Sequence, residues 1–307
     1  MDPLAPLWLG ILALFAALVN GAVGYGFSSI VTPVAILWYS NKVLNPALVI
    51  VEVAVNTTLL LRERRYIRQT WGRARPVVTT LLPGVILGTI GLAYLAVNDV
   101  KVIVYATLLP LVILQLIGFS RPFKNEARGG KAVGPGIGFL YALTTISGPP
   151  LALFLRNQGM SKNEFRCTIA QIRVAESSLT LGTYLVFSTF FGAKLITLPA
   201  VSLLPVLIVP VVIGIPLGTL LLRSVDPEFF RRFVMSIDAI LVAYGLSRVV
   251  VALNWVSNQV AYIALTFALA AVGIMTWISL RSLPRPSAAA GSSGPPPPPP
   301  GRSVADP

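Results

Sequence analysis

The stretch GAVGYGFSSIVTP, residues 21–33, interrupts a long apolar run with three glycines, two serines, a threonine and a proline. A second stretch, ALTTISGPP at residues 142–150, interrupts a later apolar run in a similar way. Glycine and proline both weaken a helix interior, so each stretch predicts a break in an apolar helix. Two breaks of the same kind indicate a structural element that occurs twice.

The composition indicates a protein of the lipid bilayer. Hydrophobic residues make up 55% of the 307-residue chain and charged residues only 11%, against about a quarter in soluble domains. Apolar runs long enough to cross a membrane recur along the chain, which predicts an all-α polytopic membrane protein. The net charge of +13 is assigned to cytoplasmic loops rather than to nucleic-acid binding. With one cysteine, Cys167, and no histidine, we expect no metal site, no cofactor and no enzymatic chemistry.

Apolar runs between polar breaks predict the membrane segments. They are Leu7–Tyr39 and Val133–Leu155, each containing a break, and Leu44–Leu61, Pro76–Val97, Val102–Phe119, Thr168–Phe191, Leu198–Leu222, Phe233–Leu253 and Val260–Leu280. After Arg281 the chain is rich in Pro, Gly and Ser, which predicts a disordered tail over residues 282–307.

The two halves of the chain are expected to be related by duplication. The sequence Gly84-Val-Ile-Leu-Gly-Thr89 recurs as Gly214-Ile-Pro-Leu-Gly-Thr219, at the same relative place after each broken segment. The Gly-x-x-x-Gly spacing lets helices approach closely, and weak internal symmetry is frequent in transporters. We expect a first repeat over residues 1–120, a second over 121–255, and an additional transmembrane helix over 256–281.

Loop charge predicts how the segments cross the membrane. The loop Arg62–Arg75 carries six arginines and one glutamate and is therefore expected in the cytoplasm. If Val133–Leu155 dips into the membrane and returns, nineteen of the twenty-four Lys and Arg residues become cytoplasmic, including those of the C-terminal tail. Two half-helices of roughly 16 Å each would fit this re-entrant hairpin. The expected fold is two inverted repeats, each a broken re-entrant hairpin plus three transmembrane helices, with one extra C-terminal helix.

The breaks are candidate sites for a small anion. A helix N-terminus carries partial positive charge and free amide groups that can bind an anion. We expect the second half-helices to span Thr32–Tyr39 and Pro149–Leu155, with Pro33 and Pro150 in their first turns. In the alternative interpretation, the glycines and prolines only kink the helices and the hydroxyls bond to local backbone. The candidate residues are Gly24, Gly26, Ser28, Ser29, Thr32, Pro33, Thr144, Thr145, Ser147, Gly148 and Pro149.

Ionisable residues inside apolar runs are candidates for coupling or gating, because such groups are costly in lipid and face the protein interior or a water path. Glu52, Arg173 and Glu176 are the main candidates. Arg173 and Glu176 are three residues apart, so they could instead form a local pair on one helix face. Arg166, just after the second hairpin, could attract an anion or simply lie at the cytoplasmic interface.

Several of these stretches resemble the sulfite exporter TauE/SafE family of permeases. They are GAVGYGFSSIVTP, RERRYIRQTWGRAR, VILGTIGLAYL, ISGPPLALFLRNQGMSKNEFRCT and IPLGTLLLRS, within residues 7–250. The resemblance implies a permease for small anions such as sulfite, sulfonates, sulfoacetate or organic acids in the bacterial cytoplasmic membrane, with the two turns and Arg166 as matching positions. A non-transporting scaffold or accessory subunit is the alternative, and homo-oligomerisation stays open.

Overall fold

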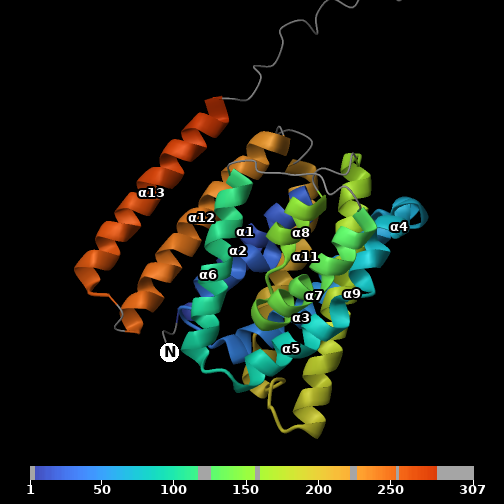
Figure 1. The fold of residues 1–307 in the computed structure, drawn as a ribbon, viewed down its shortest axis with the longest axis horizontal. Coiled ribbons are helices and arrows are strands. Elements are labelled where there is room, and N and C mark those ends of the chain that lie inside the picture. Colours follow the sequence, from blue (N-terminus) through green and yellow to red (C-terminus); the bar gives the residue numbers. More distant parts are fainter. Residues whose placement is uncertain (1–3, 117–125, 156–159, 222–226, 254–255, 282–307) are drawn as a thin grey trace, which may run out of the picture.

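The computed structural model describes residues 4–116, 126–155, 160–221, 227–253 and 256–281, and every regular element in those ranges is a helix (Figure 1). The tail over residues 282–307 and parts of the loops that connect the predicted spans lie outside the described residues. The elements are α1 Ala5–Val23, α2 Phe27–Ala35, α3 Asn41–Arg62, η1 Arg64–Tyr66, α4 Ile67–Val78, α5 Leu81–Tyr94, α6 Val97–Leu116, α7 Glu126–Thr144, α8 Gly148–Leu155, α9 Lys162–Phe190, α10 Leu198–Ser202, α11 Leu204–Leu221, α12 Pro227–Ala252 and α13 Asn258–Arg281.

The first break separates α1 from α2 through two left-handed glycines. Gly24 ends α1 with φ 94° and its N–H bonds to Asn20 O, while Gly26 has φ 111° and precedes α2. These backbone conformations favour glycine because a Cβ atom would be strained there. The expectation that Pro33 begins the second half-helix is wrong. The turn is complete at Gly26, so α2 begins at Phe27 and Pro33 lies inside it.

The second break separates α7 from α8 without glycine at its left-handed position. Thr145 takes that conformation with φ 63°, and α8 begins at Gly148. Pro149 and Pro150 therefore lie in the first turn of α8, where the missing N–H groups have no helical partner to lose. This start agrees with the predicted one to within a residue.

The two arms of each hairpin differ in length, whereas two half-helices of roughly 16 Å each were expected for the second hairpin. Helices α1 and α7 have 19 residues each, whereas α2 has 9 and α8 has 8. The first arm of the second hairpin begins at Glu126, because the helix continues through the glycine-rich segment before Val133. Arg73 lies 3.8 Å from Glu126, and Gln69 donates to Glu164 at the start of α9. Segment 126–164 thus begins and ends at one end of the bundle.

Helices α3 and α9 pack against each other. Each begins directly after a serine N-cap: Ser40 accepts from Lys42 N, and Ser161 forms a capping box with Glu164. Lys42 Nζ donates to Ala93 O at 2.9 Å, so the start of α3 lies beside the end of α5. The start of α9 lies at the opposite end of the bundle, beside η1 and α4, where Asn163 bonds the Tyr66 hydroxyl.

Glycines allow close contacts between the hairpins and their neighbours. Helix α5 lies along α7, and a Cβ added at Gly84 would lie 1.8 Å from Pro135 O. Helix α11 lies along α1, and a Cβ added at Gly218 would lie 1.9 Å from Leu18 O. Both Gly-x-x-x-Gly motifs therefore lie at backbone-to-backbone contacts, as their spacing predicts.

The expected cytoplasmic loop Arg62–Arg75 is mostly helical, which corrects the prediction. After Glu63 the chain forms η1 and then α4, which is bent by 51° from α5. Thr70, Ala74 and Val77 are the buried residues of α4, and their spacing is that of one helix face. The arginines occupy the other faces of the helix. Their charge suggested a loop, and the helical spacing of the buried residues was overlooked.

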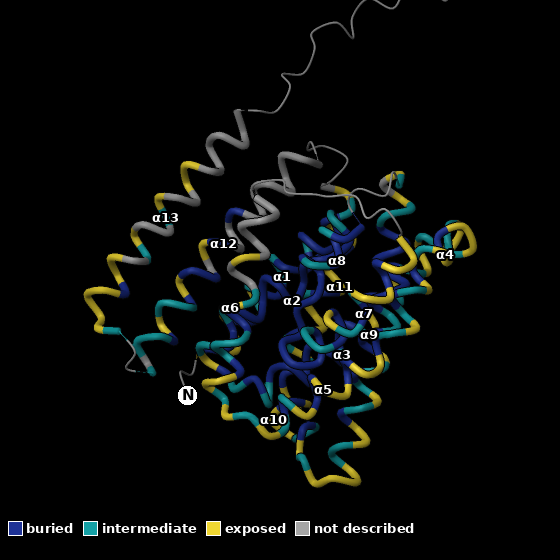
Figure 2. The backbone as a smooth tube through the Cα atoms, in the orientation of Figure 1, coloured by how far each residue is buried: buried dark blue, intermediate teal, exposed yellow. Residues whose placement is uncertain are grey.

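Several helices expose large apolar side chains on the outer surface of the bundle. Buried residues gather around α1, α2, α3 and α8, whereas the described part of α13, at the edge beside α12, is largely exposed (Figures 1 and 2). Helix α11 exposes Val209, Val212, Ile213, Leu217 and Leu220 on the side away from its glycines. By length and composition, α1, α3 and the α10–α11 segment could each cross a membrane, and the bent α4–α5 pair would add a fourth span.

Candidate functional site

The two breaks meet inside the protein, although they are more than one hundred residues apart in sequence. The Ser28 hydroxyl of α2 donates to Thr145 O, and the Thr32 and Thr145 hydroxyls lie 2.9 Å apart. Gly148 also lies against the Tyr25 ring, where an added Cβ would come within 3.0 Å. The structure thus brings together candidate residues from both breaks in one buried cluster.

Two other candidate hydroxyls bond to backbone groups close to them in the sequence. Ser29 donates to Gly26 O at 3.1 Å and Thr144 donates to Leu140 O at 2.6 Å. These are the local backbone bonds of the alternative interpretation. Ser147 differs, because its hydroxyl donates to Glu176 Oε2 at 2.6 Å. The candidate hydroxyls are therefore of two kinds, and only some of them connect separate helices.

An ion pair between α3 and α9 lies beside the second break. Arg173 Nη2 donates to Glu52 Oε1 at 2.7 Å, and both side chains are almost fully buried. The Tyr141 hydroxyl donates to Glu52 Oε2 at 2.6 Å, and the Arg173 guanidinium lies 5.8 Å from the Tyr141 ring centroid. The expected local pair of Arg173 with Glu176 is wrong, because Arg173 binds the carboxylate of a different helix.

Glu176 has one oxygen bonded and one oxygen unpartnered. Ser147 occupies Oε2, and Oε1 is buried without a hydrogen-bond partner. A buried oxygen left unpaired is costly and calls for a partner such as a proton, water or ligand. Glu176 is therefore the ionisable group directly linked to the second break.

Arg166 contacts the first break, although it follows the second in sequence. Its Nη2 donates to Gly21 O at 3.3 Å, and its Cγ would lie 3.1 Å from a Cβ added at Gly24. Its Nε lies 3.8 Å from Glu63 Oε1, which is too long for a hydrogen bond, so this buried N–H has no partner. The alternative in which Arg166 is merely an interface residue does not account for this burial.

Sequence reasoning missed Asn45, which has the corresponding position in the first half. Asn45 is five residues after the Ser40 N-cap, as Arg166 is five residues after the Ser161 N-cap. Its side-chain amide donates to Leu143 O at 2.7 Å, next to the second break. Counting from the two serine caps would have found it. The same count places Glu52 and Arg173 at equivalent positions, twelve residues after each cap.

The arrangement provides buried N–H donors near both breaks. Arg166 Nε and Arg173 Nε both lack a hydrogen-bond partner, and Arg173 Nη1 would lie 3.2 Å from a Cβ at Gly148. The first turn of α2 adds backbone amides, whereas the first turn of α8 has two prolines without N–H groups. Among the described residues, no group of His, Cys, Asp or Glu is arranged to hold a metal ion.

Apolar helices, two breaks that meet in the interior and buried charges beside them define a membrane protein of the transporter class. Comparison with known families agrees. The model of the sulfite exporter TauE/SafE family matches residues 9–245. The chain therefore belongs to the TauE/SafE family of membrane permeases. No curated protein and no solved structure matches the chain.

Proposed function

We propose that the protein is a secondary permease for small anions, sulfur-containing or organic, bound where the two breaks meet. Candidate substrates are sulfite, sulfonates and sulfoacetate. The observation that carries the proposal is the pair of buried guanidinium groups, one beside each break, each with an unpaired Nε–H. An oxyanion accepts hydrogen bonds in several directions, and charge-assisted bonds to guanidinium are among the strongest in proteins.

The two halves act as inverted repeats in this proposal. Helix α1 packs on α11, and α7 packs on α5, so each hairpin is held by the glycine-containing helix of the other half. Arg166 and Asn45 also connect the halves. Arg166 donates to Gly21 O beside the first break, and Asn45 donates to Leu143 O beside the second. These contacts support a mechanism in which the halves rock against each other around a central site.

Anion binding would replace the hydrogen bonds that now join the first break to the second. Ser28 and Thr32 are bonded to Thr145, so the breaks close on each other and no donor of these side chains is free. When the halves separate, these hydroxyls and the unpaired guanidinium groups would turn to the anion. Hydrogen bonds between the two breaks and bonds to the anion thus alternate, so the hydroxyl donors keep a partner in both states, and the anion would also satisfy the two Nε–H groups that are unpaired now.

Glu176 is the group that we assign to coupling, with Glu52 and Arg173 as the fixed ion pair beside it. A second negative charge next to the anion would weaken binding, whereas a protonated Glu176 would donate a bond of its own. Arg173, Glu52 and Tyr141 are the other ionisable groups of this cluster. We therefore propose that a proton accompanies each anion.

The end of the bundle that carries the arginines of α4 and η1 faces the cytoplasm in this proposal, in the cytoplasmic membrane of a bacterium. The C-terminal tail would lie on the same side. The first hairpin then enters from outside and the second from the cytoplasm. The substrate site is reached from either face in turn, through one hairpin at a time.

The test is flux of labelled sulfite and of a labelled alkanesulfonate in liposomes that contain the purified protein. We expect Arg166→Ala to abolish flux, because it removes the cation at the first break, and Ser147→Leu to do so by blocking the second. Arg65→Ala is the matched control, since this exposed arginine lies at the same end of the bundle. We expect Glu176→Gln to abolish proton movement with the anion.

Normal flux in both break variants, with the chain folded and inserted, would remove these residues from the mechanism. No flux of any tested anion by the unaltered protein would favour a scaffold or accessory role instead. Monodisperse elution in detergent shows that each variant has kept its fold.

A further inference from the structure

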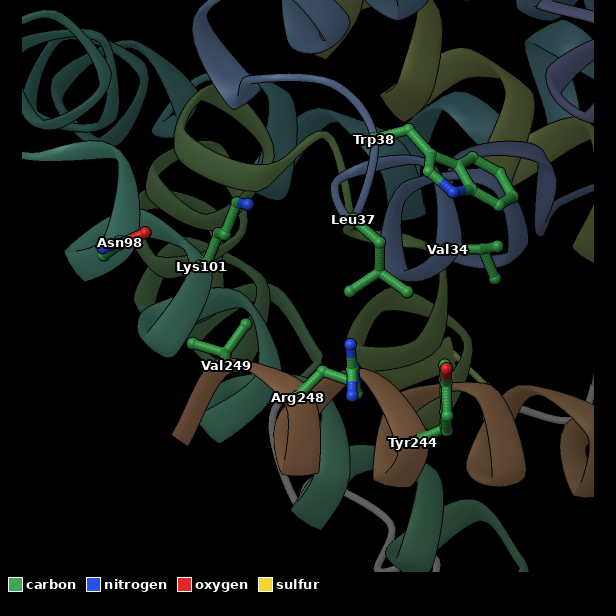
Figure 3. Close-up of a pocket in the computed structure, with 8 residues that line it drawn as sticks. All are labelled: Val34, Leu37, Trp38, Asn98, Lys101, Tyr244, Arg248 and Val249. Carbon is green, nitrogen blue, oxygen red and sulfur yellow. The ribbon is translucent and has the colours of Figure 1, made fainter. Parts of the chain in front are cut away.

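A cavity of about 480 Å³ lies at the end of the bundle opposite the arginine-rich α4, away from the contact between the breaks (Figure 3). Helix α2 and the turn after it contribute Val34, Leu37 and Trp38 to its lining. Helices α6 and α12 contribute Lys101 and Arg248, and Figure 3 shows the Arg248 guanidinium directed toward Leu37. We call this cavity the outer pocket.

The charge of the outer pocket is unusual for its place in the molecule. In the proposed orientation this end is outside the cell, where Lys and Arg are depleted. Among the described Lys and Arg residues, only Lys42, Lys101, Lys194 and Arg248 would lie there, and two of these four line one cavity. No carboxylate occurs among the described residues that line it, and Asp99 is exposed outside it. The positive charge is therefore not neutralised within the pocket.

Helix α6 links the outer pocket to the first hairpin. Tyr105 follows Lys101 by one helical turn on α6, so the two lie on the same face. Its hydroxyl donates to Pro33 O at 2.6 Å, and its ring fills the space where a Cβ on Gly245 would lie. Thr32, which bonds to Thr145 of the second break, precedes Pro33 directly. Lys101 of the pocket and Tyr105, which contacts the first hairpin, thus lie on one face of α6.

We propose that the outer pocket binds organic anions, with the anionic group on Lys101 and Arg248 and the apolar part on Trp38, Leu37 and Val34. The lining has both features that such a ligand needs: two cations on separate helices and an apolar wall from α2. Inorganic sulfite would use only the cations. The pocket therefore selects sulfonates with an organic group. The placement of the pocket outside the cell, and its role as the outer entrance to the central site, rest on the proposed permease function and orientation.

Trp38 provides a direct test of binding, because bromine quenches indole fluorescence on contact. The probe is 4-bromobenzenesulfonate, titrated into the purified chain in zwitterionic detergent, with the Trp38→Phe variant subtracted. We expect saturable quenching of Trp38 that is displaced by benzenesulfonate but only weakly by sulfite. In the Lys101→Gln/Arg248→Gln double variant we expect the apparent Kd to rise about tenfold or more.

Lys194→Gln is the matched control, because this exposed lysine lies at the same end of the helical bundle but does not line the pocket. Quenching that is unsaturable, or that survives in the double variant, would overturn the proposal. Sulfite that displaces the probe as well as benzenesulfonate does would overturn the preference for organic anions.

The phosphate of an anionic lipid offers the same chemistry as a sulfonate, so a second arm separates the two sources. In nanodiscs, phosphatidylglycerol with brominated chains quenches Trp38 if lipid occupies the pocket. Quenching by this lipid that benzenesulfonate does not relieve would overturn the proposal. Probe binding without anion flux would count against the permease function alone, and flux without probe binding would count against the pocket alone.

Discussion

The first and second breaks are equally long, residues 24–26 and 145–147, but their residues and backbone conformations differ. The first uses Gly24 and Gly26 in left-handed conformations, whereas the second places Thr145 there and begins α8 with a glycine and two prolines. The first is contacted by the cation of Arg166 and the second by the neutral amide of Asn45. The comparison shows that two breaks of equal length are built from different backbone conformations and are contacted by side chains of different charge.

The difference is greatest at the centre, where equivalent positions carry opposite charges. Glu52 and Arg173 each lie twelve residues after a serine cap and bind each other across the interface of α3 and α9. A duplicated chain with identical halves would place like charges there. In the duplication that we propose, divergence at this pair would turn repulsion into attraction and make each half require the other.

The largest expected effect comes from breaking this pair. Arg173→Leu leaves the Glu52 carboxylate buried without a cation, and loss of one partner of a buried ion pair costs about 3–5 kcal/mol. The measurement is the free energy of unfolding, or the thermal stability of the purified protein. The exchanged double variant, Glu52→Arg with Arg173→Glu, should recover part of the loss. A double variant less stable than either single variant would contradict the equivalence of the two positions.

The next effect tests whether the hairpins are held in the same way in both halves. Gly84→Ala and Gly218→Ala each put a methyl group against a carbonyl oxygen, of Pro135 and Leu18 respectively. Overpacking of this kind costs about 1–3 kcal/mol. We expect losses of similar size from both, measured by thermal stability and by the yield of monodisperse protein.

Gly136→Ala and Gly182→Ala are the matched controls for these glycines. Both residues lie in helices, α7 and α9, and an added Cβ at either would have no neighbour within 4 Å. Alanine favours a helix over glycine by up to about 1 kcal/mol, so these variants should be as stable as the unaltered chain or slightly more so. A large loss in one half only would show that the two contacts are not equivalent.

The sequence predicted these contacts because their signals are local. Two Gly-x-x-x-Gly motifs and two Gly/Pro-rich interruptions can be read from short stretches, and the structure has close contacts and breaks at those places. The partner of Arg173 is 121 residues away, so no local spacing reveals it. Only the three-dimensional crossing of α3 and α9 decides between Glu52 and Glu176.

The helical part of the arginine-rich segment was missed for a different reason. Its buried residues, Thr70, Ala74 and Val77, form a narrow stripe among six arginines, and charge density alone favoured a loop. The start of α8 could be predicted from the sequence, because prolines are favoured in the first turn of a helix. By the same rule Pro33 was assigned to the first turn of α2, although the glycines before it already complete the turn.

A smaller effect is expected when substitutions of Asn45 and Arg166 are compared. Asn45→Ala removes the bond to Leu143 O, and the expected cost is about 1 kcal/mol because both groups were neutral. Arg166→Gln keeps a polar donor but removes the charge, so the main change should be a higher KM for the anion. Measuring stability and flux for both variants tests this division. A raised KM in Asn45→Ala with unchanged stability would show that the amide also contacts the substrate.

The smallest effect concerns the two serine caps. Glu164 accepts bonds from the Ser161 backbone N–H, which hold the pKa of this exposed carboxyl below its usual range, whereas α3 has Val43 at the same place after Ser40. A carboxyl whose pKa is lowered in the folded state stabilises it above the unfolded pKa, near 4.3, and this stabilisation disappears as pH falls through the lowered value. The first turn of α9 should therefore loosen in acid while that of α3 does not. Hydrogen exchange at Phe165, compared with Glu164→Gln at each pH, measures this. Since the glutamine variant has no carboxylate, its protection should stay constant across the same range, and an acid-induced loss in both proteins would exclude Glu164 as the cause.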